Sequence, residues 1–430
     1  MRRVLFSVFL WSFVGAQDLT DAQIGVVSAR LGESALQSWE LGTRAQTILE
    51  LNATEYSVLT SKSLPPPRAI SSSLVSGLDP FFAIAKAVVS NRTAANNRTT
   101  GPQPLMPDGS AADPTSIGVS VLLANWTGQD SGQVDYAGAA LDQLDYILYK
   151  VPRTSDGAIS HRVSQVQLWS DFVYMVPPFL AYYGVTTRNR TLLAESYNQI
   201  KLYRSYLKDP TQGMWKHVVL GSSGNDQGFW TTGNGWAAAG ILRVLATIRE
   251  SEYAHTFKNE QGDLAKWVKE IHEAVYPHLD STNVFTNYAD QPATATGNFY
   301  DGSSTALLAS TVYRASLMLN QHTFVPYAER SRRTLFNSTS FPTSNATASF
   351  DGYQHLTSDG WLTPVVNPHS YGQEGSKSAE AQAFVLQLHA AHRDWVLNGS
   401  KGENSAKNML VSKHAVAFAA LIGSLVCWGW

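Results

Sequence analysis

Apolar residues recur through most of the chain at the three- and four-residue spacing of amphipathic helices, and loops rich in Gly, Pro and Asn interrupt this pattern. Asp135 and Ser378 are suitable N-caps, and Gly184 and Gly213 are suitable terminators. No run alternates apolar and polar residues for long enough to predict a sheet. The pattern predicts helices over Ala22–Leu36, Trp39–Leu51, Pro80–Val89, Ile117–Leu123, Tyr136–Tyr149, Gln167–Tyr183, Leu192–Tyr206, Gly235–Thr247, Gly262–His278, Ser304–Leu319, Phe324–Phe336 and Ala379–Val396.

So many helices with short connections predict an all-α fold of stacked helical hairpins. Hairpins arranged in a ring form a double-shelled toroid, with the loops at one end building a site. The polar stretch Ser90–Asp113 is rich in Asn, Thr, Pro and Gly, and we interpret it as a surface loop. No linker is long enough to separate two cores, so residues 17–398 are expected to form a single domain.

The first sixteen residues have the pattern of a secretory signal peptide. Arg2 and Arg3 precede the apolar run Val4–Val14, and Val14–Ala16 offers small residues for cleavage. A buried first helix is the alternative, but no caps flank the run and arginines precede it. Residues 1–16 are therefore expected to be removed during export.

The C-terminal residues 399–430 have the pattern of a GPI-anchor signal. The apolar segment Ala415–Trp430 follows a polar spacer, Gly399–Lys413, which contains the small triplet Asn404–Ala406. Sixteen apolar residues are fewer than the roughly twenty that a transmembrane helix needs. The alternative is that this segment forms the last helix of the core, although it has no polar face that such a helix would turn to solvent. We expect a secreted protein held at the cell surface or cell wall by a GPI anchor.

Several features limit the partners of the chain. The net charge of −2 and the absence of a basic stripe argue against nucleic acid. The only cysteine, Cys427, lies in the apolar tail, so no disulfides are expected, and without a CxxC or HExxH pattern no structural or catalytic zinc is indicated. N-glycans are expected at the Asn-X-Ser/Thr acceptor positions, namely Asn52, Asn91, Asn97, Asn125, Asn189, Asn337, Asn345 and Asn398.

Three short segments carry the candidate chemistry: Trp169–Phe179, Gly213–His217 and Phe229–Trp236. Indole rings stack on the apolar face of a sugar, and a few fixed polar groups can hold its hydroxyls, so these segments predict a sugar site. Its candidate binding residues are Trp169, Trp215, Lys216, His217, Trp230, Asn234 and Trp236.

Asp171 is the first candidate for an acid, four residues into the predicted helix from Gln167. Its apolar and aromatic neighbours would hold the carboxyl partly desolvated and raise its pKa, which suits a proton donor. The alternative is a first-turn residue that interacts with the helix dipole. Asp113, before Pro114, has the pattern of an N-cap, a role that leaves its carboxylate free to face a cavity.

The other candidate residues could also have purely structural roles. His217 is a candidate partner for a hydroxyl or a carboxylate, although a lone histidine is more often structural. The turn Gly233–Gly235 lets the backbone approach closely, and Asn234 can cap the helix that follows. The polar segment Asn367–Gln382 is an imperfect capping box that also suits a sugar-binding rim.

An ordered set of motifs resembles the unsaturated glucuronyl and rhamnogalacturonyl hydrolases of glycoside hydrolase families 88 and 105. The resemblance implies an (α/α)6 barrel and hydration of a C4=C5 double bond in a uronic acid, without a cofactor. It implies that Asp171 is the general acid and base, that Asp113 orients ring hydroxyls or supports the charge, and that Trp230 and Trp236 stack on the sugar. The motifs are Asp113–Gly118, Trp169–Met175, Gly213–His217, Trp230–Trp236, Ser303–Ala306 and Ser378–Phe384.

One position departs from the family pattern. Members commonly have Arg where this chain has Thr232, and a guanidinium is a natural partner for a substrate carboxylate. Another cation could bind the substrate carboxylate instead: Lys216, which is the nearest in sequence, or Arg162, His161 or His217. Two alternatives stay open: a lyase or endo-hydrolase of a wall glycan on the same barrel, and a non-catalytic glycan-binding protein.

Overall fold

The computed structural model describes residues 18–96, 100–340 and 344–403. The signal-peptide prediction and most of the GPI-anchor prediction concern residues outside these ranges, so both stay predictions. Within the described ranges, no helix has both the length and the apolar character needed to cross a membrane.

The described residues form thirteen α-helices, two short 3₁₀ helices and four short strands. The helices that pair as hairpins are long, whereas each strand has two to six residues. The α-helices are α1 Asp21–Ser34, α2 Ser38–Asn52, α3 Val75–Ala95, α4 Gly118–Trp126, α5 Tyr136–Tyr149, α6 Phe172–Met175, α7 Pro177–Thr186, α8 Arg190–Leu207, α9 Thr231–Arg249, α10 Lys258–Val275, α11 Gly302–Leu319, α12 Val325–Leu335 and α13 Ala379–Leu397. The 3₁₀ helices are η1 Asp113–Ile117 and η2 Tyr276–His278.

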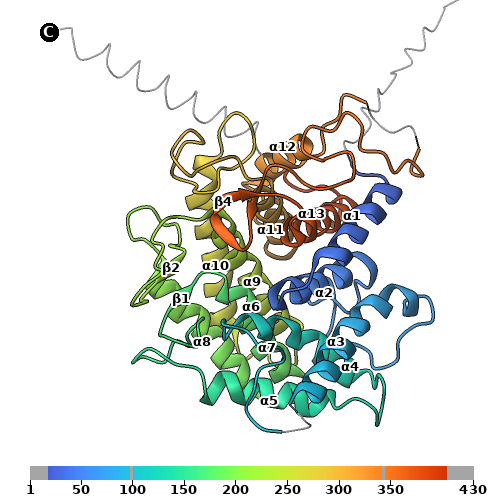
Figure 1. Cartoon of the computed structure of the whole chain (residues 1–430), viewed down its shortest axis with the longest axis vertical. Coiled ribbons are helices and arrows are strands. Elements are labelled where there is room, and N and C mark those ends of the chain that lie inside the picture. The colour runs from blue at the N-terminus through green and yellow to red at the C-terminus, as the bar shows by residue number, and fades with distance from the viewer. Residues whose placement is uncertain (1–17, 97–99, 341–343, 404–430) are drawn as a thin grey trace, which may run out of the picture.

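The helices form two concentric rings (Figure 1). The inner ring runs α2, α4, α7, α9, α11 and α13; each helix contacts the next, and α13 returns to α2. The outer helices α3, α5, α8, α10 and α12 each pack against inner helices next to them in sequence, whereas α1 packs against α13, from the other end of the chain. This arrangement is an (α/α)6 barrel, and it confirms the all-α toroid expected from the helical pattern.

The inner and outer helices differ in how much of their surface is buried. The inner helix α9 buries every residue except Ala239 and Arg249, because neighbours surround it on all sides. At Gly240, a Cβ would lie 2.1 Å from the carbonyl oxygen of Val173, so only glycine permits this approach of α9 to α6. The outer helix α10 instead buries one stripe at helical spacing, formed by Leu264, Trp267, Val268, Ile271, His272 and Val275.

The segment expected as one helix over Gln167–Tyr183 is interrupted, and that prediction was wrong. The segment opens with β1 (Leu168–Trp169), which pairs antiparallel with β2 (Val218–Val219). The chain then turns, forms the single turn of α6, and restarts as α7 at Pro177 and Pro178. Strand pairing with a segment fifty residues away overrides the local helical pattern.

Other boundaries also differ from those expected. Gly184 does not end a helix, because α7 continues to Thr186, and α8 ends at Leu207, before Gly213. Gly213 instead has a φ of +76° in the turn that follows. The sequence Gly233–Gly235 lies inside the first turn of α9 rather than before it, and α3 extends into the stretch expected as a loop from Ser90.

Two cap predictions are confirmed. The side chain of Asp135 accepts a hydrogen bond from the backbone N–H of Gly138 at 2.8 Å. The hydroxyl of Ser378 accepts one from the backbone N–H of Ala381 at 3.1 Å and begins α13. Both caps satisfy N–H groups that have no partner within the helix.

Six of the eight predicted glycosylation asparagines are exposed. Asn337 is half-buried, and Asn97 lies outside the described residues. Glycosylation itself stays a prediction. The exposed positions are Asn52, Asn91, Asn125, Asn189, Asn345 and Asn398.

Candidate active site

A cavity of about 250 Å³ lies at the end of the barrel where the inner helices begin. Trp39 and Glu380 are the second residues of α2 and α13, and Trp236 lies in the second turn of α9. The hairpin of β3 (Val365–Asn367) and β4 (Ser370–Gly375) contributes Tyr371. The lining residues are Trp39, Asp108, Asp113, His161, Arg162, Trp169, Asp171, Met175, His217, Trp230, Trp236, Pro368, His369, Tyr371 and Glu380.

Asp171 lies in the turn between β1 and α6. Its side chain makes no capping hydrogen bond to α6, so it is not held by the helix that follows. The side chain is 14% exposed, and its Oδ2 atom accepts a hydrogen bond from the hydroxyl of Ser170 at 3.1 Å. Burial raises the pKa of Asp171, and nearby His217 offsets part of that rise. The carboxyl is therefore suited to carry a proton that it can give away.

His217 faces Asp171 and is fully buried. Its Nε2 atom lies 3.5 Å from Oδ2 of Asp171, and its Nδ1 atom lies 2.9 Å from Oδ2 of Asp226. Burial alone would raise the pKa of Asp226, but hydrogen bonds from His217 and Tyr288 hold it below its usual value. An ionised Asp226 accepts a hydrogen bond from Nδ1–H, which leaves Nε2 facing the cavity and Asp171.

Asp113 and His161 form a second carboxyl–imidazole pair. The Nε2 atom of His161 lies 3.5 Å from Oδ1 of Asp113, whose side chain is 14% exposed. Asp113 is the first residue of η1 and makes no side-chain cap, so its predicted capping role was wrong. Burial raises the pKa of Asp113 well above its usual value, and repulsion from Asp108 and Asp171 adds to this. Both pairs are therefore held in a poorly solvated cavity.

Aromatic rings surround the two pairs. The ring of Trp169 stacks on His161 at 4.8 Å between centroids and meets His217 edge-on at 5.3 Å. The ring of Trp230 lies 4.4 Å from His217, and Tyr371 meets the same imidazole at 4.4 Å. These contacts fix the orientation of His217 and leave apolar walls around the carboxyls.

Three of the predicted binding residues lie outside the cavity lining. Trp215 is buried, and the side-chain amide of Asn234 bonds both its N–H and its C=O, each at 2.9 Å. Asn234 therefore does not cap α9; it holds the loop that carries His217 against that helix. The ammonium of Lys216 lies 3.4 Å from Oε1 of Gln227 and does not line the cavity.

Three of the four candidate partners for a substrate carboxylate, Arg162, His161 and His217, line the cavity, and Arg162 is the one that carries a guanidinium. Its guanidinium lines the cavity 5.7 Å from the centroid of the Trp169 ring. It forms no hydrogen bond or ion pair with another side chain in the described part of the chain, so it is available to a ligand. Thr232, in contrast, is buried and donates a hydrogen bond to Asp301 at 3.2 Å.

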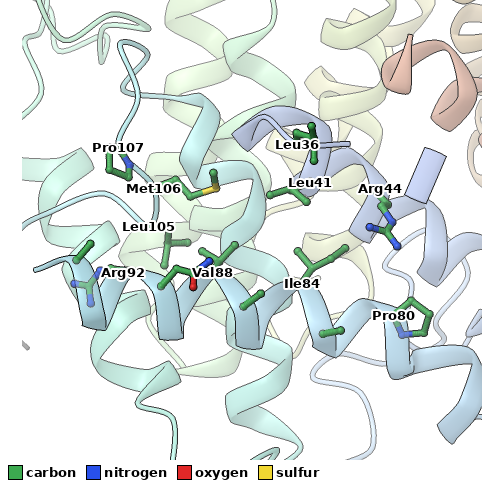
Figure 2. Close-up of a pocket in the computed structure, with 14 residues that line it drawn as sticks. Leu36, Leu41, Arg44, Pro80, Ile84, Val88, Arg92, Leu105, Met106 and Pro107 are labelled. Atoms are coloured by element: carbon green, nitrogen blue, oxygen red, sulfur yellow. The ribbon is translucent and has the colours of Figure 1, made fainter. Parts of the chain in front are cut away.

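A second cavity, of about 460 Å³, lies between α3 and the start of α2 (Figure 2). Ile84 and Val88 of α3 face Leu41, Leu105 and Met106 across it. Its walls are mostly apolar and contain no carboxyl group or imidazole. It therefore lacks the groups that acid–base chemistry needs, and we place the candidate site in the smaller acidic cavity.

The chain matches the model of glycosyl hydrolase family 88 over residues 92–357, which include every residue predicted for the site. The chain belongs to glycosyl hydrolase family 88. The family expected from the ordered motifs is thereby confirmed.

One curated relative is the unsaturated rhamnogalacturonyl hydrolase YesR of Bacillus subtilis (strain 168). It is 27% identical over 142 residues, which are 31% of this chain and 40% of the relative. The matched region thus spans less than half of that protein.

Two solved structures share the fold of this family 88 chain. A possible member of the GH105 family from Klebsiella pneumoniae has a TM-score of 0.63 at 16% identity, covering 87% of this chain and 93% of the other. The unsaturated glucuronyl hydrolase from Bacillus sp. GL1 has a TM-score of 0.53 at 13% identity, covering 87% and 94%. The (α/α)6 fold is therefore confirmed by comparison as well.

Sequence reasoning missed several residues of this family 88 cavity. Trp39 comes from the first helical hairpin and Asp108 from the loop that follows. Tyr371, of the β3–β4 hairpin, lies within Asn367–Gln382, the segment expected to suit a sugar-binding rim, but it was not named by itself. Glu380 has the pattern of an ordinary first-turn residue of α13. It was not named by itself, but it lies in the possible sugar-binding rim Asn367–Gln382 and in the family motif Ser378–Phe384. No group of three or more potential metal ligands occurs among the described residues.

Proposed function

We propose that this family 88 protein hydrates the C4=C5 double bond of an unsaturated uronic acid at the end of an oligosaccharide. The observation that carries the proposal is the buried carboxyl of Asp171, 3.5 Å from an imidazole oriented by Asp226, in a cavity walled by tryptophans. The name of the curated relative, an unsaturated rhamnogalacturonyl hydrolase, supports the substrate class.

Asp171 acts first as the general acid. Its carboxylic proton is transferred to C4 of the sugar, and positive charge develops over C5 and the ring oxygen. The resulting carboxylate of Asp171 then accepts a proton from a water molecule as the water oxygen bonds to C5. Asp171 is thereby returned to its protonated form, and the product is a hemiketal at C5. Opening of this hemiketal breaks the ring and releases the neighbouring sugar.

The surrounding groups support these steps. Nε2 of His217 can form a hydrogen bond with a sugar hydroxyl, and Asp113 can bind a second hydroxyl opposite it. The flat walls formed by Trp169, Trp230 and Trp236 suit the apolar face of a sugar ring. Such fixed partners hold the double bond near the acid, which is the main requirement for proton transfer.

Two features of the cavity can stabilise the negative charge of the substrate. Arg162 provides a guanidinium without a partner in the described residues. The N-terminal ends of α2, α9 and α13 also converge here, and helix N-termini carry partial positive charge. Both favour an anionic sugar despite the carboxyl groups in the wall.

The test is turnover of oligosaccharides made by polysaccharide lyases, followed through the ultraviolet absorbance of the C4=C5 double bond. The absorbance of the substrate should disappear when it is incubated with the purified protein, and it should stay nearly unchanged with the Asp171→Asn variant. Saturated oligosaccharides of the same composition serve as the specificity control. Stable absorbance with every unsaturated uronide tested, or cleavage of the saturated sugars instead, would contradict the proposed reaction.

A further inference from the structure

Glu380 is a buried carboxyl in the cavity wall that the mechanism above does not use. It is the second residue of α13, and the residue is only 4% exposed. Its Oε1 atom has no hydrogen-bond partner among the described residues. A buried polar atom without a partner costs free energy. Because Glu380 lines the cavity, a ligand there can satisfy that atom.

The groups around Glu380 are mostly acidic. Burial raises its pKa well above the usual value, and repulsion from Asp171, Glu40 and Asp301 adds to the rise. The indole of Trp39 is the one group that acts in the opposite direction. In the cavity wall, the guanidinium of Arg162 lies beside Trp169, and the imidazole of His369 lies 4.0 Å from Glu40.

Burial and the acidic neighbours both favour the protonated form of this carboxyl. A neutral carboxylic acid has an O–H donor that an ionised carboxylate lacks. The strongest acceptor for that donor is an anionic oxygen, because a charge-assisted hydrogen bond is about twice as strong as a neutral one. A neutral Glu380 also avoids the repulsion that a charged carboxylate would exert on an anionic substrate.

We propose that Glu380, whose buried Oε1 atom in the cavity wall has no partner among the described residues, is a substrate-binding residue that donates a hydrogen bond to the carboxylate of the uronic-acid substrate. This inference rests on the proposed function, because it assigns a partner to the carboxylate of that substrate. It adds a proton-dependent contact to the one that Arg162 provides.

Two substitutions separate this role from others. Glu380→Gln keeps the size of the side chain and an N–H donor, whereas Glu380→Ala removes the donor. For an unsaturated uronide, Glu380→Ala should raise KM about ten- to a hundredfold, while Glu380→Gln should change it by no more than about threefold. The methyl ester of the same uronide has no anionic carboxylate, so KM for the ester should respond little to either change. Glu55→Gln, at an exposed position, controls for the loss of a negative charge.

The pH dependence gives an independent measurement. In the parent protein, KM for the uronide should rise as the pH rises through the elevated pKa of Glu380, because ionisation removes the donor and adds repulsion. Glu380→Gln does not titrate, so it should lose this part of the profile. This comparison decides the question even if Glu380→Ala fails to fold, which thermal melting would reveal.

The outcomes distinguish the two proposals. Failure of the parent protein to consume any unsaturated uronide overturns the proposed function and this contact with it. Turnover by the parent with unchanged KM in Glu380→Ala overturns the role of Glu380 alone. If Glu380→Ala raises KM equally for the acid and the ester, Glu380 contacts a sugar hydroxyl instead, and the assignment to the substrate carboxylate is wrong.

Discussion

The Nδ1 atom of His217 lies 2.9 Å from the Oδ2 atom of Asp226. The same carboxylate accepts a hydrogen bond from the hydroxyl of Tyr288 at 2.7 Å and one from the backbone N–H of Gly228 at 3.0 Å. Asp226 does not line the cavity, yet it determines which nitrogen of His217 carries the proton. It is therefore a positioning residue that acts through the imidazole.

Asp226→Asn should weaken catalysis without removing any group from the cavity. The amide cannot replace an ionised acceptor for both Nδ1–H and the tyrosine hydroxyl, so His217 loses its fixed tautomer. We expect kcat/KM to fall about ten- to a hundredfold, the usual effect of losing a charge-assisted hydrogen bond. Asp263→Asn is the matched control, because Asp263 also accepts from a tyrosine, Tyr197, at 2.6 Å. Equal kinetics for the two variants would exclude the positioning role.

Asp171→Asn should remove the transferable proton while preserving size. Positioned acid catalysis contributes about 10²–10⁴-fold, so kcat should fall by at least the lower factor. The elevated pKa of Asp171 gives the sign of the pH profile: the acid is present below that pKa, and kcat/KM should decline as the pH rises through it. Exposed Asp290→Asn should leave the profile intact. Near-normal turnover by Asp171→Asn would remove Asp171 from the mechanism.

Arg162→Met and Lys216→Met form a matched pair of charge deletions. Arg162 lines the cavity and Lys216 does not, so only the first should matter for substrate charge. We expect Arg162→Met to lower kcat/KM for an unsaturated uronide about tenfold to a hundredfold more than for its methyl ester. Lys216→Met should affect both substrates equally and little. Steady-state kinetics with the two substrates would refute this assignment if Lys216→Met proved the more selective change.

His272 should make the fold sensitive to acid. Burial lowers its pKa to about 3, and Thr311 lies 2.9 Å from its Nε2 atom. In the unfolded chain, His272 takes up a proton near pH 6.5, whereas in the folded protein it stays neutral down to about pH 3. Its contribution to the free energy of unfolding is therefore complete above pH 6.5 and is lost as the pH falls toward about 3. The loss is about 1.4 kcal/mol per pH unit in this window.

His272→Gln does not titrate, so its free energy of unfolding should fall less steeply with acid than that of the parent. Denaturant titrations at several pH values between 3 and 7 measure the difference. His255→Gln, at an exposed position, should follow the parent. Parallel curves for the parent and His272→Gln would show that His272 does not contribute to acid sensitivity.

The helical periodicity was sufficient to predict the barrel, because an inner and an outer helix each need apolar residues at helical spacing. It could not predict the break at Asp171. Leu168 pairs with Val219, and local helix preference is worth less than this tertiary contact. Gly233–Gly235 was expected before α9 for the same reason, because glycine and asparagine disfavour a helix locally. Packing in the buried inner ring stabilises the helical turn that these residues alone do not favour.

The sequence by itself determined which kinds of groups are available: the aromatic motifs, Asp113, Asp171 and His217, in an order that is specific for one family. Only the tertiary structure decided which of them meet. Ring closure brings Trp39 near the start of the chain and Glu380 near its end into the same cavity, and it leaves Lys216 outside while placing Arg162 inside. The physical reason is that a local pattern reports whether a residue can be buried in its own helix or loop. The pKa of a carboxyl and the partner of a cation depend instead on groups that packing brings from distant parts of the chain.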